Sequence, residues 1–437
     1  MLTAFTRAFK TPDLRRKLLF TLAIIIIFRL GSHVPVPGVS YTAVQACIKS
    51  ADSTTGVLGL ANLFSGGALL QLSIFALGIM PYITASIIVQ LLTVVIPRFE
   101  ALKKEGQQGQ TKMTQYTRYL TIGLAVLQSS TLITFAQNPS ALFGPSCTSI
   151  LPDESIPVLV IMVLTMTAGT GMVMWLGELV TDKGIGNGMS LLIFTSIASS
   201  FPSSLWAIQQ QDGRWDIFIG VILLGFLIIA LVVFVEQSQR RIPVQYAKRQ
   251  VGRQMYGGTS TYIPLKVNMA GVIPVIFASS LLALPSLLSQ FNRSTTGDQA
   301  GWVTWIDQHL VRGDHPIYMI TYIALILFFT FFYVSITFNP TEVADNMKKY
   351  GGFIPGIRAG RPTAEYLDYV LTRITVPGAI YLGLVSLIPL IALVLVGANQ
   401  NFPFGGTSIL IIVGVGLETV KQIESQLQQR HYEGFLR

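Results

Sequence analysis

The sequence predicts an all-α membrane protein whose chain crosses the bilayer ten times. Of its 437 residues, 51% are hydrophobic and only 12% are Asp, Glu, Lys or Arg, whereas soluble domains carry about 25% charged residues. So little charge cannot cover a water-facing surface, but a surface in contact with lipid is apolar. A spanning helix needs about 20 mostly apolar residues. Ten such segments are found at residues 18–36, 73–96, 117–137, 156–178, 186–206, 216–236, 268–290, 316–338, 374–397 and 405–423.

The basic residues are distributed very unequally among the segments between these spans. If the N-terminus is cytoplasmic, 25 of the 30 Lys and Arg residues fall in cytoplasmic segments and four in outer segments. Membrane proteins show this excess of basic residues in their cytoplasmic loops. The bias predicts an even number of spans and places both termini in the cytoplasm. Arg29, inside the first span, is expected to reach toward the interface rather than to act in the mechanism.

The sequence lacks the motifs of common catalytic sites. It contains no GxxxxGK[ST] loop for ATP, no HExxH metal site and no GxSxG nucleophile elbow. Cys47 and Cys147 have no CxxC spacing, and the chain has only four histidines, so a metal site is not expected. We therefore predict neither an enzyme nor a cofactor. Both cysteines fall on the predicted outer side, and the sequence leaves open whether they pair.

A short internal repeat relates the second predicted span to the seventh. Residues 78–86 read GIMPYITAS and residues 271–279 read GVIPVIFAS, identical at five of nine positions without a gap. Inverted repeats are common in membrane transport proteins. The repeat predicts two five-span halves of opposite orientation, an N-terminal half at 1–206 and a C-terminal half at 207–437.

The repeat also suggests a seam that can open. Its prolines are expected to bend the two spans from within, because Pro removes a backbone hydrogen bond. The small polar residues that follow allow close packing and weak bonds between helices. Bonds from these hydroxyls to their own helix are an equally good interpretation.

Three other segments are notable. The predicted cytoplasmic loops 237–267 and 339–373 are long and basic, which is typical of functional loops. They are interpreted either as a docking surface for a cytoplasmic partner or as solvated loops. The third segment, 58–72, is apolar but too short to span the bilayer.

Long motifs in the chain resemble those of the SecY family, the channel subunit of the bacterial protein translocon. The resemblance rests on SIFALGIMPYITASIIVQLL at 73–92 and WLGELVTDKGIGNGMSLLIF at 175–194. It extends to QRRIPVQYAKRQ at 239–250, LKVNMAGVIPVIFASS at 265–280, FNPTEVADNMKK at 338–349 and GFIPGIRAG at 352–360. These motifs are long and follow one another in order over nearly the whole chain.

The resemblance implies a clamshell of two halves around a central pore in the cytoplasmic (inner) membrane, with a plug helix and a lateral gate. By motif position, an apolar pore ring would consist of Ile79, Ile83, Met189, Ile193, Ile276 and Ile411. The plug, at about 58–72, would include Phe64, Ser65, Gly66 and Gly67. The lateral gate would include Pro81, Thr84, Ser86, Gln128, Pro274, Ser279 and Ser280, and partner docking would use Arg249, Arg253 and Arg358.

The same resemblance implies the partners and the activity. The partners would be SecE and SecG subunits, the SecA motor ATPase, the ribosome, accessory translocase subunits, secretory precursor polypeptides and membrane lipid, with no specific nucleic-acid sequence. The chain would be a passive pore that moves secretory polypeptides across the membrane and releases membrane-protein segments sideways into lipid. A secondary transporter of small solutes is the alternative. It is disfavoured because ionisable residues at mid-membrane depth, which ion coupling requires, are almost missing.

Overall fold

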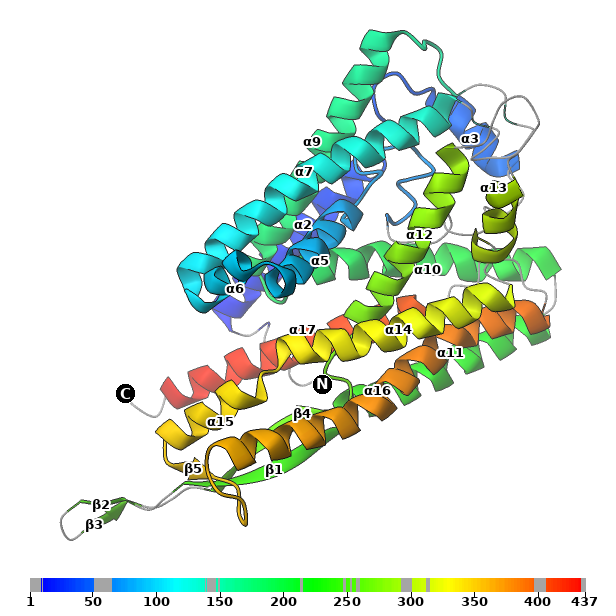
Figure 1. The fold of residues 1–437 in the computed structure, drawn as a ribbon. Helices are drawn as coiled ribbons and strands as arrows, with labels where there is room; N and C mark the ends of the chain where they lie inside the picture. The colour runs from blue at the N-terminus through cyan, green and yellow to red at the C-terminus, as the bar shows by residue number, and fades with distance from the viewer. Residues whose placement is uncertain are drawn as a thin grey trace.

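The computed structural model shows a predominantly helical protein (Figure 1). It describes residue 9 and residues 11–50, 65–137, 139, 147, 150–212, 215–246, 249–251, 254–256, 260–291, 301–311, 315–396 and 406–433. A long helix occupies each of the ten ranges that hydropathy singled out. These are α2 (Pro12–Gly31), α5 (Met80–Val95), α7 (Gln107–Gln137), α9 (Ile156–Lys183), α10 (Gly188–Asp212), α11 (Trp215–Gln237), α12 (Ile273–Phe291), α14 (Pro316–Thr337), α16 (Arg361–Val396) and α17 (Gly406–Glu433).

Several of these helices qualify as membrane spans by length and hydropathy. Among the described residues, three helical stretches do so: Ile156–Lys183, Pro316–Lys349 and Arg361–Ile388. A fourth arises if α5 and the following helix α6 (Pro97–Lys104) form one span, although the two meet at an angle of 100°. The structure therefore establishes several apolar helices, and ten crossings remain a prediction.

The helices pack as two groups with separate cores. In the first group α7 lies against α5 and α9, and α9 also contacts α2; in the second, α14 lies against α12 and α16, and α17 contacts α11 and α16. The groups surround two different buried clusters, one containing Met162 and Met166 and the other containing Ile326 and Leu382. Helix α10 contacts both α9 and α17 and so joins the groups (Figure 1).

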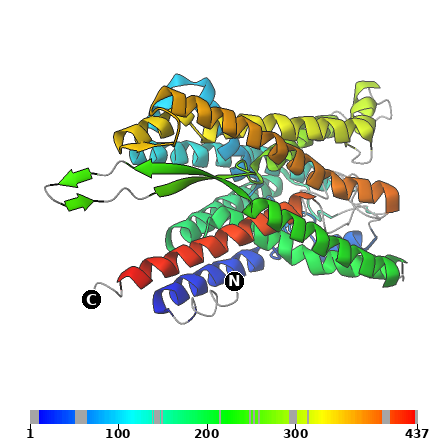
Figure 2. The same ribbon diagram turned by 90° about the horizontal axis from the view of Figure 1, so that it is seen from below.

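A small β-structure projects from one end of the molecule (Figure 2). Strand β1 (Gln239–Tyr246) pairs antiparallel with β4 (Ser260–Lys266) and with the short β5 (Gly352–Phe353), in the order β4-β1-β5. Beyond them β2 (Arg249–Val251) pairs with β3 (Gln254–Tyr256). The short helix α15 (Pro340–Lys349) and the start of α16 pack on the sheet, because Ile242, Val244, Met347 and Leu367 share one buried cluster.

These strands join the two predicted loops, 237–267 and 339–373. Gln245 pairs with Phe353 and Tyr246 with Gly352, so the two segments form one folded unit. Ile242 and Val244 face its core, whereas the residues beside them are exposed, as a period of two requires in a half-buried strand.

The repeat has a different structural meaning from the one expected. Gly78 and Gly271 both have positive φ, 54° and 61°, a conformation that glycine adopts without steric cost. Each is followed two residues later by the first residue of a helix, Met80 of α5 or Ile273 of α12. Pro81 and Pro274 thus stand in the first helical turn, where Pro is tolerated because its missing N–H has no helical partner. The prediction that the two prolines bend the helices from within is wrong, because both prolines lie in the first helical turn.

The only two cysteines of the sequence, both predicted to lie on the outer side, form a disulfide. Cys47 lies in α3 (Tyr41–Ser50), and its partner Cys147 precedes α9. Both are buried in the core of the first helix group. The question left open by the sequence is thereby answered. Two further short helical segments, α13 (Gly301–Ile306) and the π-helical Asp307–Val311, lie between α12 and α14.

The predicted plug segment is described only in part. Phe64 and the residues before it back to 58 lie outside the described residues. Residues 65–72 form turns rather than a regular helix, and the chain stays non-helical until α5 begins at Met80. The expected span 73–96 is accordingly shorter at its start than hydropathy indicates.

Candidate pore and gate

An apolar cluster lies where the two helix groups meet. We call it the constriction cluster; its buried members are Phe28, Phe75, Ile79, Val173, Met189, Leu192, Ile193, Ile197, Ile276 and Ile411. Five of the six predicted ring residues are among them, and the sixth, Ile83, is half-buried and packs against the cluster. The structure thus brings together six residues that span more than 300 positions of the sequence.

Local helix geometry explains how these side chains converge. Residues four apart on a helix lie on the same face, and the amide of Ile83 donates to the carbonyl of Ile79 at 3.1 Å. Met189 and Ile193 are related in the same way within the first turns of α10. Ile276 lies one turn into α12 and Ile411 in the second turn of α17. Four chain segments therefore each contribute one short apolar edge.

Sequence reasoning missed the aromatic part of the cluster. Phe28 of α2 stacks on Phe75, with ring centroids 5.9 Å apart. Gly31 makes room for this pair, since a Cβ at that position would overlap the ring of Phe75. A period of 3.6 along residues 73–79 could not have revealed Phe75, because that segment is not helical.

Two cavities open beside the cluster. One, of about 460 Å³, is lined by Ile83, Met189, Ile193 and Ile276 together with polar side chains of α5, α7 and α9. The other, of about 550 Å³, is lined by Ile193, Ile276 and Ile411 together with polar side chains of α17 and with Glu236, Lys266 and Asn268. Both combine polar side chains with apolar residues of the cluster. This arrangement resembles a funnel that ends at an apolar constriction.

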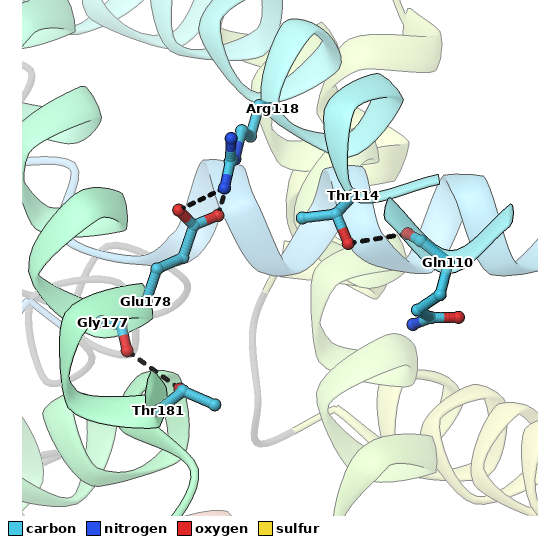
Figure 3. A network of polar contacts seen from close by, with 6 residues as sticks. All are labelled: Gln110, Thr114, Arg118, Gly177, Glu178 and Thr181. Atoms are coloured by element: carbon cyan, nitrogen blue, oxygen red, sulfur yellow. Dashed lines mark hydrogen bonds and ion pairs between the residues drawn. The ribbon is translucent and has the colours of Figure 1, made fainter. Parts of the chain in front are cut away.

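An ion pair forms part of the wall of the first cavity. Arg118 of α7 donates to both carboxylate oxygens of Glu178 of α9, each at 2.8 Å (Figure 3). Such bidentate pairs fix orientation as well as distance. The neighbouring Gly177 lies directly against Met189 of the constriction cluster, so the pair holds α7 to α9 close to the cluster.

The predicted gate residues lie on α5, α7 and α12. Thr84 donates to the carbonyl of Met80 at 3.0 Å and Ser279 to that of Ile276 at 2.9 Å, so both hydroxyls bond to their own helices rather than across the seam. Helices α5 and α12 are nevertheless in contact. The other predicted gate residues are a buried Pro81, a half-buried Ser86 that lines the first cavity, a half-buried Gln128 on α7, Pro274 at the start of α12 and a half-buried Ser280.

A contact between α6 and α14 joins the two helix groups directly. The ammonium of Lys103 in α6 donates to the carbonyl of Ile336, in the last turn of α14, at 3.3 Å. A cation at a helix C-terminus is favourable because the last carbonyls lack helical partners. The contact is solvent-exposed, so its contribution is small.

The start of the described plug segment is held against the constriction region. The guanidinium of Arg29 donates to the carbonyl of Gly66 at 2.7 Å. On its other side Gly66 faces α10, because a Cβ there would lie 3.1 Å from the Cα of Ser196. Arg29 is thus engaged with Gly66 rather than directed only to an interface.

Of the three predicted docking residues, only Arg358 is fully described. Arg358 is exposed in the turn between β5 and α16, between Gly356 and Gly360, which both have positive φ. Arg249 begins β2, but its side chain is outside the described part of the chain. Arg253 lies outside the described residues altogether. Among the residues that are described, no group of three or more His, Cys, Asp or Glu side chains could hold a metal ion.

The fold is that of known protein-conducting channels. A solved structure titled as that of a protein conducting channel matches 94% of this chain and 91% of its own, with a TM-score of 0.62 and 18% identity. A second, whose title concerns the plug domain of SecY and the closed state of its channel, has the same coverage and TM-score and 19% identity. A third, Sec61 in the canine ribosome-channel complex, has a TM-score of 0.60, 18% identity and coverage of 94% and 91%.

Sequence comparison identifies the family. The SecY family model matches residues 73–420. The protein translocase subunits SecY of Streptomyces galbus and Streptomyces griseus are 69% and 70% identical to the chain, over 100% of both sequences in each case. The chain belongs to the SecY family. This is a family of channel subunits rather than of catalytic enzymes.

Proposed function

We propose that the chain forms the pore through which secretory polypeptides cross the cytoplasmic membrane, and from which membrane-protein segments pass sideways into lipid. The relatives that match its full length are named protein translocase subunits, and the channels that share its fold are described as protein-conducting. Within this chain, the proposal depends on one observation: both helix groups contribute to a single apolar constriction cluster, and two cavities lined partly by polar side chains reach Ile193 and Ile276 of that cluster.

The chemistry of the pore ring suits a seal that a polypeptide can pass. A narrow apolar constriction loses its water and so blocks ions without any charge. No directional bond holds aliphatic side chains in place, so a moving chain can displace them. Met189 adds flexibility, because its unbranched thioether side chain adapts to irregular shapes.

We assign the seam between α5 and α12 to the lateral gate and the segment that begins with Ser65, Gly66 and Gly67 to the plug. Support for the gate comes from the hydroxyls of Thr84 and Ser279, which bond to their own helices, so few directional bonds oppose separation. Support for the plug comes from its irregular turns and from the hydrogen bond that Arg29 donates to Gly66.

The energy for transport would come from a partner. The excess of basic residues favours a cytoplasmic side for the β-structure, both termini and Arg358, where the ribosome or the SecA motor ATPase would dock beside Arg249 and Arg253. Arg suits this contact because its planar guanidinium forms bidentate bonds with carboxylates and phosphates. SecE, SecG and accessory translocase subunits would complete the assembly in the membrane. One of the related channels was solved in a complex with the ribosome.

Reconstitution tests the proposal. Vesicles that contain the chain with SecE and SecG, supplied with SecA and ATP, should protect a secretory precursor from external protease. Vesicles without the chain are the control. The proposal fails if the precursor is never protected, and solute uptake by the chain alone would favour the alternative of a secondary transporter.

A further inference from the structure

The junction between strand β4 and helix α12 connects the projecting sheet to the candidate gate. Strand β4 ends at Lys266 and α12 begins at Ile273; we call residues 267–272 the junction. One turn further on, α12 carries Ile276 of the constriction cluster. A displacement of β4 can therefore reach α12 along the chain only through these six residues.

Asn268 is the anchor of the junction. Its side chain is 3% exposed, and its amide group donates to the carboxylate of Glu236 at 2.6 Å and to the carbonyl of Gly271 at 3.2 Å. Glu236 belongs to the last turn of α11, which leads into β1. A hydrogen bond to a charged acceptor is about twice as strong as one between neutral groups. One side chain thus ties the end of α11 to the start of α12.

Backbone contacts reinforce this tie on both sides. The amide of Val267 donates to the carbonyl of Ser238 at 3.1 Å, so the two chain segments that enter the sheet are bonded to each other at its base. Helix α16 presses on the junction at Gly378, where a Cβ would lie 2.5 Å from the carbonyl oxygen of Val267. The first residue of the junction, Val267, is therefore held between the base of the sheet and α16.

The internal repeat supplies a comparison within the same molecule. The alignment that pairs Gly78 with Gly271 also pairs Phe75 with Asn268. Phe75 anchors the start of α5 by stacking on Phe28 inside the membrane core. Asn268 anchors the start of α12 to the base of the β-structure instead. Two equivalent helix starts thus have different anchors, and only the one before α12 leads to the projecting sheet.

We infer that Asn268 is a positioning residue that couples the β-structure to α12, so that a partner bound at the projecting end moves the gate helix together with the end of α11. The inference rests on the proposed function, because it assigns α12 to the gate and the β-structure to docking. It predicts that loss of the Asn268–Glu236 hydrogen bond uncouples the two events: the partner still binds, but the gate does not respond.

The test measures binding and gate movement separately in the reconstituted complex. Cysteines at Ser86 of α5 and Phe277 of α12, which line the same cavity, report the seam by their rate of disulfide formation under oxidant. In the otherwise unchanged protein, the ATP-driven partner should slow this rate. Asn268→Asp places two carboxylates together and should abolish most of this slowing. The factor by which the partner slows disulfide formation should fall by an amount within the roughly 5- to 150-fold range of known couplings. Partner affinity should change less than about twofold, since surfaces outside the contact are unaltered.

Matched variants make the outcome specific. Glu236→Gln keeps an acceptor for Asn268, so the partner should slow disulfide formation in this variant almost as in the unchanged protein. Glu236→Ala removes the acceptor and should lose most of the slowing. If Asn268→Asp fails to fold, these two variants test the coupling role of Asn268. The double variant Asn268→Asp with Glu236→Gln reverses donor and acceptor and should restore part of the response. A normal response in Asn268→Asp and Glu236→Ala would overturn the inference while leaving the proposed function intact. No response in the unchanged protein would overturn the proposed gate itself.

Discussion

The guanidinium of Arg29 donates a hydrogen bond to the carbonyl of Gly66 across 37 positions of the sequence, at 2.7 Å. Gly66 is thereby held between α2 and Ser196 of α10. Ser196 lies between Ile193 and Ile197 of the constriction cluster along the same helix. The contact therefore links α2, the proposed plug and the proposed pore in one small region.

Replacing Arg29 with Ala should increase the ion leak of the resting channel. A hydrogen bond from a charged group is worth about 1.5–3 kcal/mol, so its loss would shift the plug segment toward displaced states. Conductance of reconstituted bilayers without a partner measures the leak. Arg29→Lys should give an intermediate leak, and Arg16→Ala, on an exposed position of the same helix, should give none. Equal leaks for Arg29→Ala and Arg16→Ala would contradict the anchoring role.

A pair of glycines provides an independent check on the same contact. Gly66 and Gly67 both have positive φ, 66° and 88°, so Ala at either position is strained to a similar degree. Only at Gly66 would the added Cβ meet neighbours, with Arg29 and Ser196 both at 3.1 Å. Gly66→Ala should therefore leak more than Gly67→Ala in the same conductance measurement. Indistinguishable leaks would show that backbone strain alone decides the effect.

A polar side chain in the constriction should open it to ions. Ile276→Asn keeps a similar size but offers hydrogen bonds to water, which an apolar gate excludes. We expect resting conductance to rise well above that of Ile276→Leu, which keeps the apolar character and volume. Precursor transport should persist in both variants, because the ring acts as a seal and not as a motor. An Asn variant as tight as the Leu variant would remove Ile276 from the proposed seal.

The Arg118–Glu178 pair should stabilise the contact between α7 and α9. Its bidentate geometry and the 21% exposure of the Glu178 side chain place it near the upper end of the roughly 0.2–1 kcal/mol found for exposed pairs. A double-mutant cycle with Arg118→Met and Glu178→Gln, read from thermal unfolding in detergent, measures this coupling. The cycle for Arg361 and Glu365, whose side chains are 90% and 65% exposed, should give almost none. A coupling no larger in the first cycle than in the second would refute the assignment.

The Cys47–Cys147 disulfide should contribute strongly to stability at the outer end. It closes a loop of 100 residues, for which chain entropy alone gives a stabilisation of about 4.7 kcal/mol. We expect the double variant Cys47→Ser with Cys147→Ser to unfold at a lower temperature. Reductant should lower the unfolding temperature of the unchanged protein by a similar amount and leave that of the variant unaltered. An unchanged protein insensitive to reductant would show that the bond contributes little.

Hydropathy predicted the long helices well because their apolar runs are dictated by the membrane environment. It could not predict where α5 and α12 begin. In both cases a glycine with positive φ, Gly78 or Gly271, sets the first helical residue. That signal was present in the repeat, but the prolines beside it suggested bends within longer helices.

The β-structure escaped prediction for a physical reason. Strands β1 and β4 contain Pro243 and Pro264, and a proline normally argues against a strand because it cannot donate to the ladder. Only Ile242 and Val244 show the alternation of a half-buried strand in β1. Pairing with β5, which is more than 100 residues away, depends on contacts that no local pattern encodes.

For the candidate site too, the sequence indicated some residues and could not indicate others. The motif positions indicated all six residues of the proposed pore ring, and the structure places them together. The partners of Arg29 and Asn268 could not be foreseen, because one is a backbone carbonyl and the other depends on how α11 meets the junction. Polar contacts of this kind depend on tertiary geometry rather than on residue type.

Cross-linking of a stalled precursor to the constriction tests the central claim most directly. A secretory precursor with a single cysteine is halted partway through the reconstituted channel and oxidised. The account predicts a disulfide with Ile276→Cys in the constriction cluster and none with Leu164→Cys, whose side chain is 61% exposed on α9. A precursor that reaches the far side of the membrane without ever linking to Ile276→Cys would contradict a path through this pore.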